Sequence, residues 1–174
     1  MLIALTGIPG VGKTQCAEIL RKRGRYVIDL NELATSKGFG EEYDEEYDSH
    51  IIDVEALDGF ITSEYRGAEV IFDGHLSHLL TVDMAVILRC NPIELQKRLQ
   101  VKSWSDQKLL ENVQAEVLDV IKIEAYEHLD RVYELDTTAK RPEEIADLFE
   151  AIISGRSKGD NVAWLEDFEY LLFQ

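Results

Sequence analysis

The segment with the strongest chemical signal is Gly7-Ile8-Pro9-Gly10-Val11-Gly12-Lys13-Thr14, which matches the pattern G-x-x-x-x-G-K-[ST] in full. Glycines let the backbone curl so that successive N–H groups face one anion, and a Cβ there would obstruct phosphates. The helix that begins at Lys13 adds the partial positive charge of its N-terminus. We therefore predict that Lys13 reaches the β- and γ-phosphates of a nucleotide and that Thr14 coordinates magnesium. The predicted nucleotide-binding residues here are Gly7, Gly10, Val11, Gly12, Lys13, Thr14 and Gln15.

A second acidic element fits with this loop. Val70-Ile71-Phe72-Asp73 is an apolar strand that ends in an acid, the form in which phosphate-loop proteins hold magnesium through a water molecule. Strands also end in Asp for turn reasons alone, so the loop is what makes a metal-binding Asp73 the preferred interpretation. His75 lies two residues further on and could orient an attacking water or acceptor oxygen. For His78, a functional role and simple packing at the sheet edge stay equally open.

The rest of the chain must position these groups, and its pattern alternates short apolar runs with helical periodicity. The alternation predicts a three-layer α/β fold of the P-loop NTPase type, with a five-stranded parallel sheet and helices on both faces. The predicted strands are 2–6, 26–29, 69–73, 84–90 and 131–136. The predicted helices are 13–23, 92–100, 105–129 and 142–154, the long one from core positions spaced three and four apart.

The stretch 159–174 is predicted to form a C-terminal helix. Its apolar face, with Val162, Leu165, Phe168 and Leu172, indicates docking on the domain. Its aromatic residues could instead form a face that binds a partner.

Composition restricts the function classes. The 174 residues fit one domain, and a net charge of −16 disfavours direct binding of the nucleic-acid backbone. That charge permits a basic protein partner, although solubility or adaptation to salt explains it equally well. The first residues run from Met1 into a core strand without a basic flank, so we expect no signal peptide. The two cysteines have neither metal-ligand nor redox spacing, so a reduced cytoplasmic setting is expected.

Taken together, several motifs resemble one known family. The phosphate loop, the acidic run YDEEYD from Tyr43 to Asp48 and the triplet Asp73-Gly74-His75 are similar to those of nuclear-type, ribosome-maturation-linked adenylate kinases, also called adenylate kinase isoenzyme 6. LQKRL at 95–99 and Glu111-Asn112 before a helix fit the same pattern. The resemblance extends over residues 1–154, and the chain is identified as a prokaryotic, archaeal-type member.

The resemblance implies a single domain with two mobile inserts, a monophosphate-binding segment at 29–52 and a short lid at 101–111. It implies phosphoryl transfer from ATP to AMP with Mg²⁺, and a slower ATPase activity that uses Asp73 and His75. It also implies a role in maturation of the small ribosomal subunit, through a basic small-subunit ribosomal protein. Site residues implied in this way are Arg98 and Lys102 over the donor, Lys140 and Arg141 beside the adenine, and Asn31, Thr35 and Lys37 for the monophosphate.

Two departures from the family pattern bear on function. Thr35 stands where members carry an arginine in the monophosphate segment, and Lys102-Ser103-Trp104 stands where the lid reads Arg-Gly-Tyr. A lysine keeps the charge but lacks the bidentate, stackable fork of arginine. We therefore expect a weaker grip on AMP, poorer lid closure and broader acceptor specificity.

Two other functions stay open at this stage. The chain could be a ribosome-assembly ATPase whose nucleotide state switches its grip on a ribosomal protein, with little kinase turnover. The acidic run at 41–48 and the missing arginine favour that alternative, although the run could equally be a solvated loop. A kinase for a small metabolite on the same fold is the third possibility, and the acidic run disfavours it.

Overall fold

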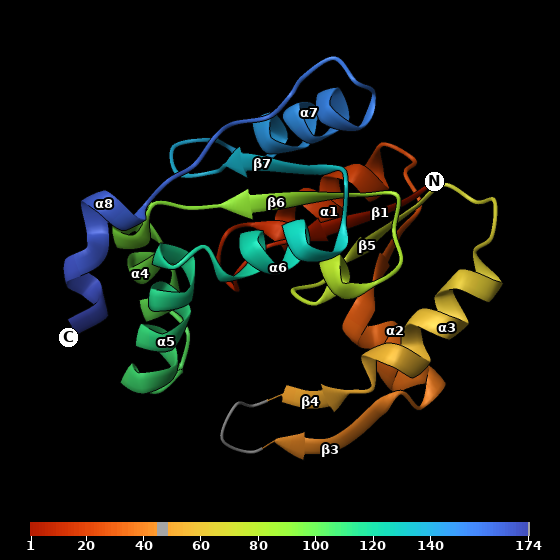
Figure 1. The fold of residues 1–174 in the computed structure, drawn as a ribbon, viewed down its shortest axis with the longest axis horizontal. Helices are drawn as coiled ribbons and strands as arrows, with labels where there is room; N and C mark the ends of the chain where they lie inside the picture. The colour runs from red at the N-terminus through yellow and green to blue at the C-terminus, as the bar shows by residue number, and fades with distance from the viewer. Residues whose placement is uncertain (45–48, 174) are drawn as a thin grey trace.

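A computed structural model describes residues 1–44 and 49–173 of the chain (Figure 1). Residues 45–48, which belong to the acidic run singled out in the sequence, lie outside the described residues. None of the helices within the described ranges is long and apolar enough to cross a membrane.

The centre of the molecule is a five-stranded parallel sheet with the strand order β2-β5-β1-β6-β7. The predicted strands are all present, as β1 (Leu2–Thr6), β2 (Val27–Asp29), β5 (Val70–Asp73), β6 (Met84–Arg89) and β7 (Val132–Asp136). β1 occupies the middle because it is hydrogen-bonded to β5 on one side and β6 on the other. The carboxyl ends of β1 and β5, where the chemical motifs begin, are therefore neighbours, as expected for an open α/β sheet.

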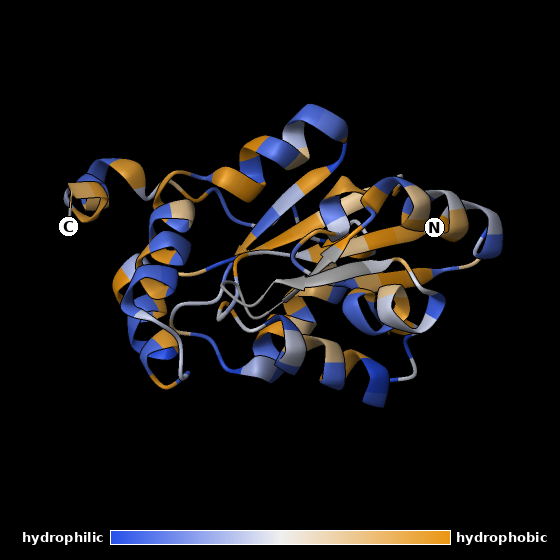
Figure 2. Ribbon diagram, turned by 90° about the horizontal axis from the view of Figure 1, so that it is seen from below, coloured by the Kyte–Doolittle hydropathy of each residue, from blue (hydrophilic) through white to orange (hydrophobic). Residues whose placement is uncertain are grey.

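Helices cover both faces of the sheet, which confirms the predicted three-layer fold (Figure 1). α1 (Lys13–Lys22) packs beside α7 (Pro142–Ile153), and α6 (Val120–His128) lies against β6 on the other face. The strands are mostly hydrophobic, while the helices carry hydrophobic residues on one side (Figure 2). Because both faces of the sheet are buried, its strands read as continuous apolar runs.

A second, smaller core supports the segment between β2 and β5. It is formed by α2 (Leu30–Lys37), α3 (Val54–Glu64) and the face of β5 that carries Val70 and Phe72. An antiparallel pair, β3 (Gly40–Asp44) with β4 (Ser49–Ile52), extends from these helices (Figure 1). The structure thus places α2 and a hairpin within the predicted monophosphate segment 29–52.

The predicted helix 105–129 was wrong as a single element. It is divided into α5 (Asp106–Val117) and α6, because Asp119 adopts a left-handed conformation with φ of 57°. The Asp119 carboxylate accepts a hydrogen bond from the buried guanidinium of Arg89, which also donates to Glu116 and Glu134. A buried Arg needs such partners, and Asp is among the residues that tolerate positive φ. The break therefore places one of these carboxylates against Arg89.

The predicted C-terminal helix over 159–174 was also too long. Residues 159–164 belong to no helix, and Asp160 forms an antiparallel bridge with Glu134 of β7. Only α8 (Leu165–Phe168) and a short 3₁₀ helix, η2 (Glu169–Phe173), are helical. Val162 is buried, and Phe168 and Leu172 pack against the core as expected, whereas Leu165 is exposed and Leu171 is buried instead.

The remaining elements connect this frame to the motifs. They are a 3₁₀ helix η1 (Ser77–Leu79) after β5, and α4 (Pro92–Gln100) after β6. α4 packs beside α5, and residues 101–105 between them form the first half of the predicted lid 101–111.

Candidate active site

The phosphate loop between β1 and α1 is held in a shape that only glycine allows. Gly7, Gly10 and Gly12 have φ of 135°, 95° and 106°. A Cβ on Gly7 would lie 2.4 Å from the carbonyl oxygen of Leu88, so a larger residue cannot be accommodated without backbone movement. The loop backbone therefore packs closely on the end of β6 and curls as the sequence pattern predicts.

The N-terminus of α1 is open to an anion. Among the described residues, no side chain caps the first amides of α1, and its first turn contains no acidic residue. In contrast, α2 and α3 are capped by the carboxylates of Asp29 and Asp53, and α4 and α5 by the side chains of Asn91 and Ser105. Uncapped amides at a helix start need another acceptor, and a phosphate group supplies it.

Lys13 lies at the centre of the loop. Its ammonium donates hydrogen bonds to the carbonyl oxygens of Gly7 at 2.7 Å and Ile8 at 3.1 Å. Burial lowers the pKa of Lys13 to about 8, although the neighbouring Asp73 opposes the shift. Among the described residues, this half-buried cation donates its hydrogen bonds to carbonyl oxygens, so it gains from a bound anion, which is the predicted role of this residue.

Asp73 ends β5 beside the loop and is 5% exposed. Its register partner across the sheet is Asp29, the last residue of β2. Burial raises the pKa of Asp73 to about 6, and Lys13 acts in the opposite direction while Asp29 adds to the increase. Ionising a carboxyl group that is buried next to another acid costs free energy, and a bound cation would offset that cost. Such arrangements are common at functional sites that bind a cation.

The two histidines after Asp73 lie in different surroundings. His75 lines the cleft, and burial lowers its pKa to about 4, so its imidazole is neutral near pH 7. None of the described residues hydrogen-bonds that imidazole. His78 is 1% exposed and lies beneath the loop, where its ring is within hydrogen-bond distance of Thr6 and Glu124.

These groups line one cleft of about 630 Å³ at the carboxyl ends of the strands. Its described lining comes from the phosphate loop, the ends of β2 and β5, and the start of the predicted lid. The residues are Pro9, Gly10, Gly12, Lys13, Thr14, Gln15, Asp29, Asn31, Asp73, Gly74, His75, Arg98, Val101 and Lys102. The structure thus brings together the predicted Lys13, Thr14, Asp73, His75, Arg98 and Lys102, although they come from distant parts of the sequence.

Arg98 is oriented toward the cleft by the loop after β7. Its guanidinium donates to the carbonyl oxygens of Thr137 at 3.2 Å and Thr138 at 2.9 Å, and to Glu94 at 3.2 Å. Thr137 is fully buried, and its hydroxyl lies 2.8 Å from the carbonyl oxygen of Val11 in the phosphate loop. The loop after β7 therefore contacts both Arg98 and the phosphate loop, and it sets the position of one relative to the other.

The start of the predicted lid carries two lysines stacked on one aromatic ring. The ammonium groups of Lys102 and Lys108 each lie 4.5 Å from the ring centroid of Trp104. Burial and the charge of Lys108 lower the pKa of Lys102. A cation over an aromatic face is attracted by the ring, so this contact competes with binding of Lys102 to a ligand.

Other predicted site residues lie apart from the cleft lining. Lys37 is placed over the ring of Phe60, 5.2 Å from its centroid. Lys140 donates to the carbonyl oxygen of Asp136, and the exposed Arg141 pairs with Glu144. Thr35 lies in α2. The roles of these four residues stay predictions.

Sequence reasoning missed two participants. Asp29 has the same signal as Asp73, an acid at the carboxyl end of an apolar strand, and could have been found by it. Thr137 carries no such signal, because its role depends on contacts with the distant Val11, Arg89 and Arg98.

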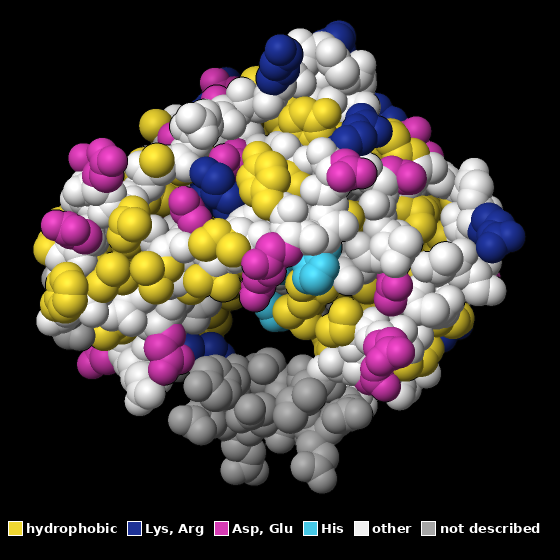
Figure 3. All heavy atoms as spheres, in the orientation of Figure 1, with side chains coloured by type: hydrophobic (Ala, Val, Ile, Leu, Met, Phe, Trp, Pro, Cys, Tyr) yellow, Lys and Arg dark blue, Asp and Glu magenta, His cyan; other side chains and the backbone are white. Residues whose placement is uncertain are grey.

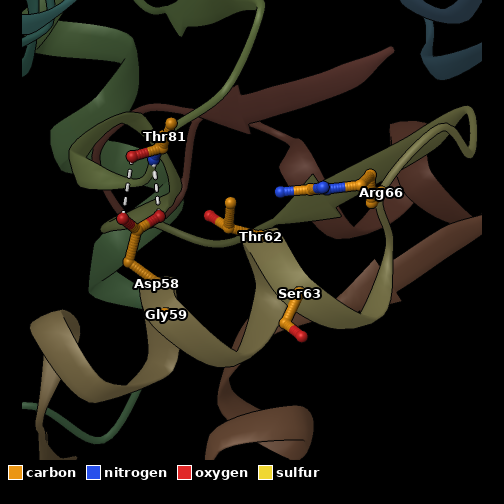
Figure 4. Close-up of a pocket in the computed structure, with 6 residues that line it drawn as sticks. All are labelled: Asp58, Gly59, Thr62, Ser63, Arg66 and Thr81. Carbon is orange, nitrogen blue, oxygen red and sulfur yellow. Dashed lines mark hydrogen bonds between the residues drawn. The ribbon is translucent and has the colours of Figure 1, made fainter.

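A second hollow, also of about 630 Å³, lies between α3 and the loop before β6 (Figure 4). Asp58 points toward Thr81 and accepts hydrogen bonds from its amide at 2.6 Å and its hydroxyl at 2.8 Å (Figure 4). The acid is thus already satisfied, and Arg66 is the cation in the lining. This hollow lacks the phosphate loop and the residues grouped around Lys13.

Comparisons with known proteins show which family the chain resembles in sequence. The family model described as an AAA domain matches residues 3–119. A protein of Archaeoglobus fulgidus named "Putative adenylate kinase" is 49% identical over 175 residues, which cover 97% of this chain and 94% of that protein. A protein of Methanocaldococcus jannaschii with the same name is 43% identical over 178 residues, covering 100% of this chain and 99% of that protein.

Solved structures show the same fold at low sequence identity. The YorR protein of Bacillus subtilis, in complex with phosphorylated GDP, has a TM-score of 0.60 at 17% identity and covers 88% of this chain and 96% of its own. Shikimate kinase from Bacteroides thetaiotaomicron has a TM-score of 0.52 at 16% identity and covers 88% of this chain and 98% of its own. These likenesses extend to the fold alone, and they confirm the predicted fold class.

Proposed function

The chain belongs to the same family as these archaeal proteins, and from that premise we propose that it is a nucleoside monophosphate kinase that transfers the γ-phosphoryl group of ATP to AMP. The observation that carries this proposal is the single cleft described above. It joins a phosphate loop, with the half-buried Lys13, to a wall built from the ends of β2 and β5. A donor and an acceptor can therefore lie in line between the two sides.

On the donor side, the uncapped amides of α1 and the ammonium of Lys13 bind the phosphates of ATP. Lys13 gives up its bonds to the Gly7 and Ile8 carbonyl oxygens when it turns to the phosphates. Arg98 neutralises charge at the donor end, where Thr137 and Thr138 hold it. Phosphoryl transfer needs such positioning and charge neutralisation more than covalent chemistry. Lys140 and Arg141, in the segment after β7, are proposed to flank the adenine.

Magnesium fits the pair formed by Thr14 and Asp73. Thr14 follows Lys13 in the first turn of α1, and Asp73 is a buried carboxyl group whose pKa is raised mainly by burial. An oxygen-only donor set of this kind suits Mg²⁺, which keeps several waters and binds phosphate oxygens as well. When bound, the ion neutralises the charge of the β- and γ-phosphates.

His75 is proposed to orient the acceptor. Because its imidazole is neutral and hydrogen-bonds none of the described residues, it can accept a hydrogen bond from water, and its other ring nitrogen can donate one to a phosphate oxygen. Asn31 lies on the same wall and offers an amide to a monophosphate. Thr35 and Lys37 are proposed to reach the monophosphate from α2, which requires Lys37 to leave Phe60.

One observation favours an accompanying ATPase activity. The basic residues that line the cleft are Lys13, Arg98 and Lys102, all on the donor side, whereas the wall from β2 and α2 contributes Asp29 and Asn31. On this wall an acceptor phosphate therefore meets the carboxylate of Asp29, and none of the wall's described lining residues is an arginine. Water, which carries no charge, is at less of a disadvantage there than a phosphate.

Membership in the adenylate kinase isoenzyme 6 branch, and with it a link to maturation of the small ribosomal subunit, stays part of the proposal. The net charge of −16 is compatible with a basic protein partner. On the face drawn in Figure 3, however, acidic side chains are dispersed among hydrophobic and basic ones. The charge is therefore equally compatible with general solubility, and a binding measurement with a basic partner must decide.

The test of the kinase is ADP formation from ATP and each nucleoside monophosphate in the presence of magnesium, beside a reaction without acceptor. We expect AMP-dependent ADP formation that Lys13→Ala abolishes. Lys22→Ala, an exposed lysine on the same helix, is the matched control and keeps the activity. Phosphate release that no monophosphate changes would make the chain an ATPase switch instead. Stimulation only by a small metabolite acceptor would make it a kinase of another substrate class.

A further inference from the structure

His78 forms the middle of a chain of hydrogen-bonding groups beneath the phosphate loop. Its Nδ1 lies 3.1 Å from the hydroxyl of Thr6, and its Nε2 lies 2.9 Å from the carboxylate of Glu124. Thr6 is the last residue of β1 and immediately precedes Gly7, while Glu124 belongs to α6. Thr6 is fully buried and His78 is 1% exposed, so the contact between these two residues is sheltered from water, whereas the side chain of Glu124 is 44% exposed.

The directions of these hydrogen bonds follow from the chemistry of the groups. A carboxylate only accepts, so Nε2 must carry the proton that faces Glu124. In the neutral ring Nδ1 is then an acceptor, and the Thr6 hydroxyl donates to it. Burial lowers the pKa of His78, which agrees with a neutral ring, although Glu124 opposes that shift.

His78 also belongs to the tight turn that carries His75. The amide of Ser77 donates to the carbonyl oxygen of Gly74 at 3.2 Å, and the hydroxyl of Ser77 lies 2.8 Å from the same oxygen. The carbonyl oxygen of His75 also lies 3.2 Å from the Thr6 hydroxyl, but that hydroxyl has a single proton, so donation to Nδ1 of His78 makes this second contact close packing and not a further full hydrogen bond. Because the His75 imidazole hydrogen-bonds none of the described residues, the position of its ring depends on this turn.

We propose that His78 is a positioning residue that fixes the turn 74–78 against the phosphate loop through Thr6, and so places His75 for phosphoryl transfer. The proposal rests on the proposed function, since it assigns His75 a task in that reaction. Glu124 acts at the other end of the His78 ring, where it keeps the proton on Nε2. Nδ1 is then free to accept the hydrogen bond from the Thr6 hydroxyl. Removing a residue that orients a reacting group reduces turnover more than substrate binding.

Two amide substitutions separate the two ends of the ring. In His78→Asn the side-chain oxygen takes the place of Nδ1 and can still accept from Thr6. In His78→Gln the amide nitrogen takes the place of Nε2 and reaches only Glu124. His128→Asn, an exposed histidine at the end of α6, is the control for loss of an imidazole.

We expect His78→Asn to keep kcat within about threefold and His78→Gln to lose about tenfold or more, with the KM for ATP changed less than about twofold. In a His75→Ala background the two variants should have the same kcat. The proposal would be overturned if His78→Asn and His78→Gln had equal kcat values when His75 is present. It would also be overturned if their kcat values differed as much in the His75→Ala background as in the protein that keeps His75.

An NMR measurement of the nucleotide-free protein needs no turnover and therefore separates this proposal from the proposed function. Nitrogen-15 shifts should show His78 as the Nε2–H tautomer at pH 7. The ring signals of His75 should move in His78→Gln and stay near their original positions in His78→Asn. An Nδ1–H tautomer, or His75 signals that respond equally to both variants, contradicts the proposal. A wild-type protein without AMP-dependent ADP formation would instead count against the kinase.

Discussion

Asp29 and Asp73 are register partners at the carboxyl ends of the parallel strands β2 and β5, and both line the cleft. Their proximity contributes to the raised pKa of Asp73, of about 6, for which burial is the larger cause. Since only an ionised Asp73 can serve magnesium, Mg²⁺ binding to the ATP complex should weaken as the pH falls through this range.

Asp29→Asn should lower the pKa of Asp73 and move this loss of Mg²⁺ binding to lower pH. Asparagine is an equally good N-cap, so the hydrogen bond from the Glu32 amide, now 2.9 Å, should persist and α2 should stay folded. The measurement is a Mg²⁺ titration at a series of pH values. Asp53→Asn, the same change at the N-cap of α3, is the control. An unchanged pH profile for Asp29→Asn would show that the two carboxylates are not coupled.

Lys13 gives a second pH dependence of opposite direction. Its pKa of about 8 in the nucleotide-free protein means that it loses charge as the pH rises above that value. Bound phosphates raise this pKa, so the Kd for ATP should increase about tenfold per pH unit above about 8, until the pKa of the complex is reached. Lys13→Arg, which keeps its charge, should flatten the profile, while Lys22→Arg should not. Calorimetric titration at a series of pH values measures the Kd for ATP. If the Kd of Lys13→Arg still increased about tenfold per pH unit above about 8, the pH dependence could not be assigned to Lys13.

Lys102 should influence the balance between hydrolysis and transfer. Its ammonium stacks on Trp104 and lacks the planar fork with which arginine binds phosphate. Lys102→Arg should therefore close the lid better and lower the ratio of phosphate release to AMP-dependent ADP formation about threefold or more. Lys97→Arg, the same exchange at an exposed position of α4, is the control for the added guanidinium group. A ratio equal to that of wild type speaks against a role of Lys102 in excluding water.

The phosphate loop should be intolerant of a methyl group for steric as well as conformational reasons. Gly67 has φ of 80° with open space around its missing Cβ, so Gly67→Ala should cost only about 1 kcal/mol of unfolding free energy. Gly7 combines φ of 135° with a Cβ position 2.4 Å from the Leu88 carbonyl oxygen. Gly7→Ala should cost about 3 kcal/mol or more. Urea denaturation of the nucleotide-free variants measures both, and equal losses would rule out the steric contribution.

The sequence predicted the sheet well because its strands are buried on both faces and bounded by turns. It did not predict α2 and α3, although Asp29 and Asp53 lie at their N-caps and Leu57 and Ile61 are spaced as core positions of one helix. Those helices were recoverable from local signals. The break at Asp119 was not, because it depends on the buried guanidinium of Arg89, thirty residues away.

The candidate site likewise contains residues that local sequence signals identify and residues that only tertiary packing distinguishes. The sequence could place Lys13, Thr14 and Asp73 in one cleft because they belong to local motifs, a loop and a strand end. His75 and His78 look equivalent in the sequence, yet one faces the cleft and the other is buried under β1. Only the packing of η1 against β1 and α6 distinguishes them, and that information is tertiary.

The most direct test of the central claim is a single turnover with ATP labelled in its γ-phosphoryl group, mixed with AMP and magnesium. The kinase predicts that the label appears in ADP, and that Lys13→Ala prevents this. Label found only in inorganic phosphate, with AMP unchanged, would contradict phosphoryl transfer to a monophosphate and leave an ATPase.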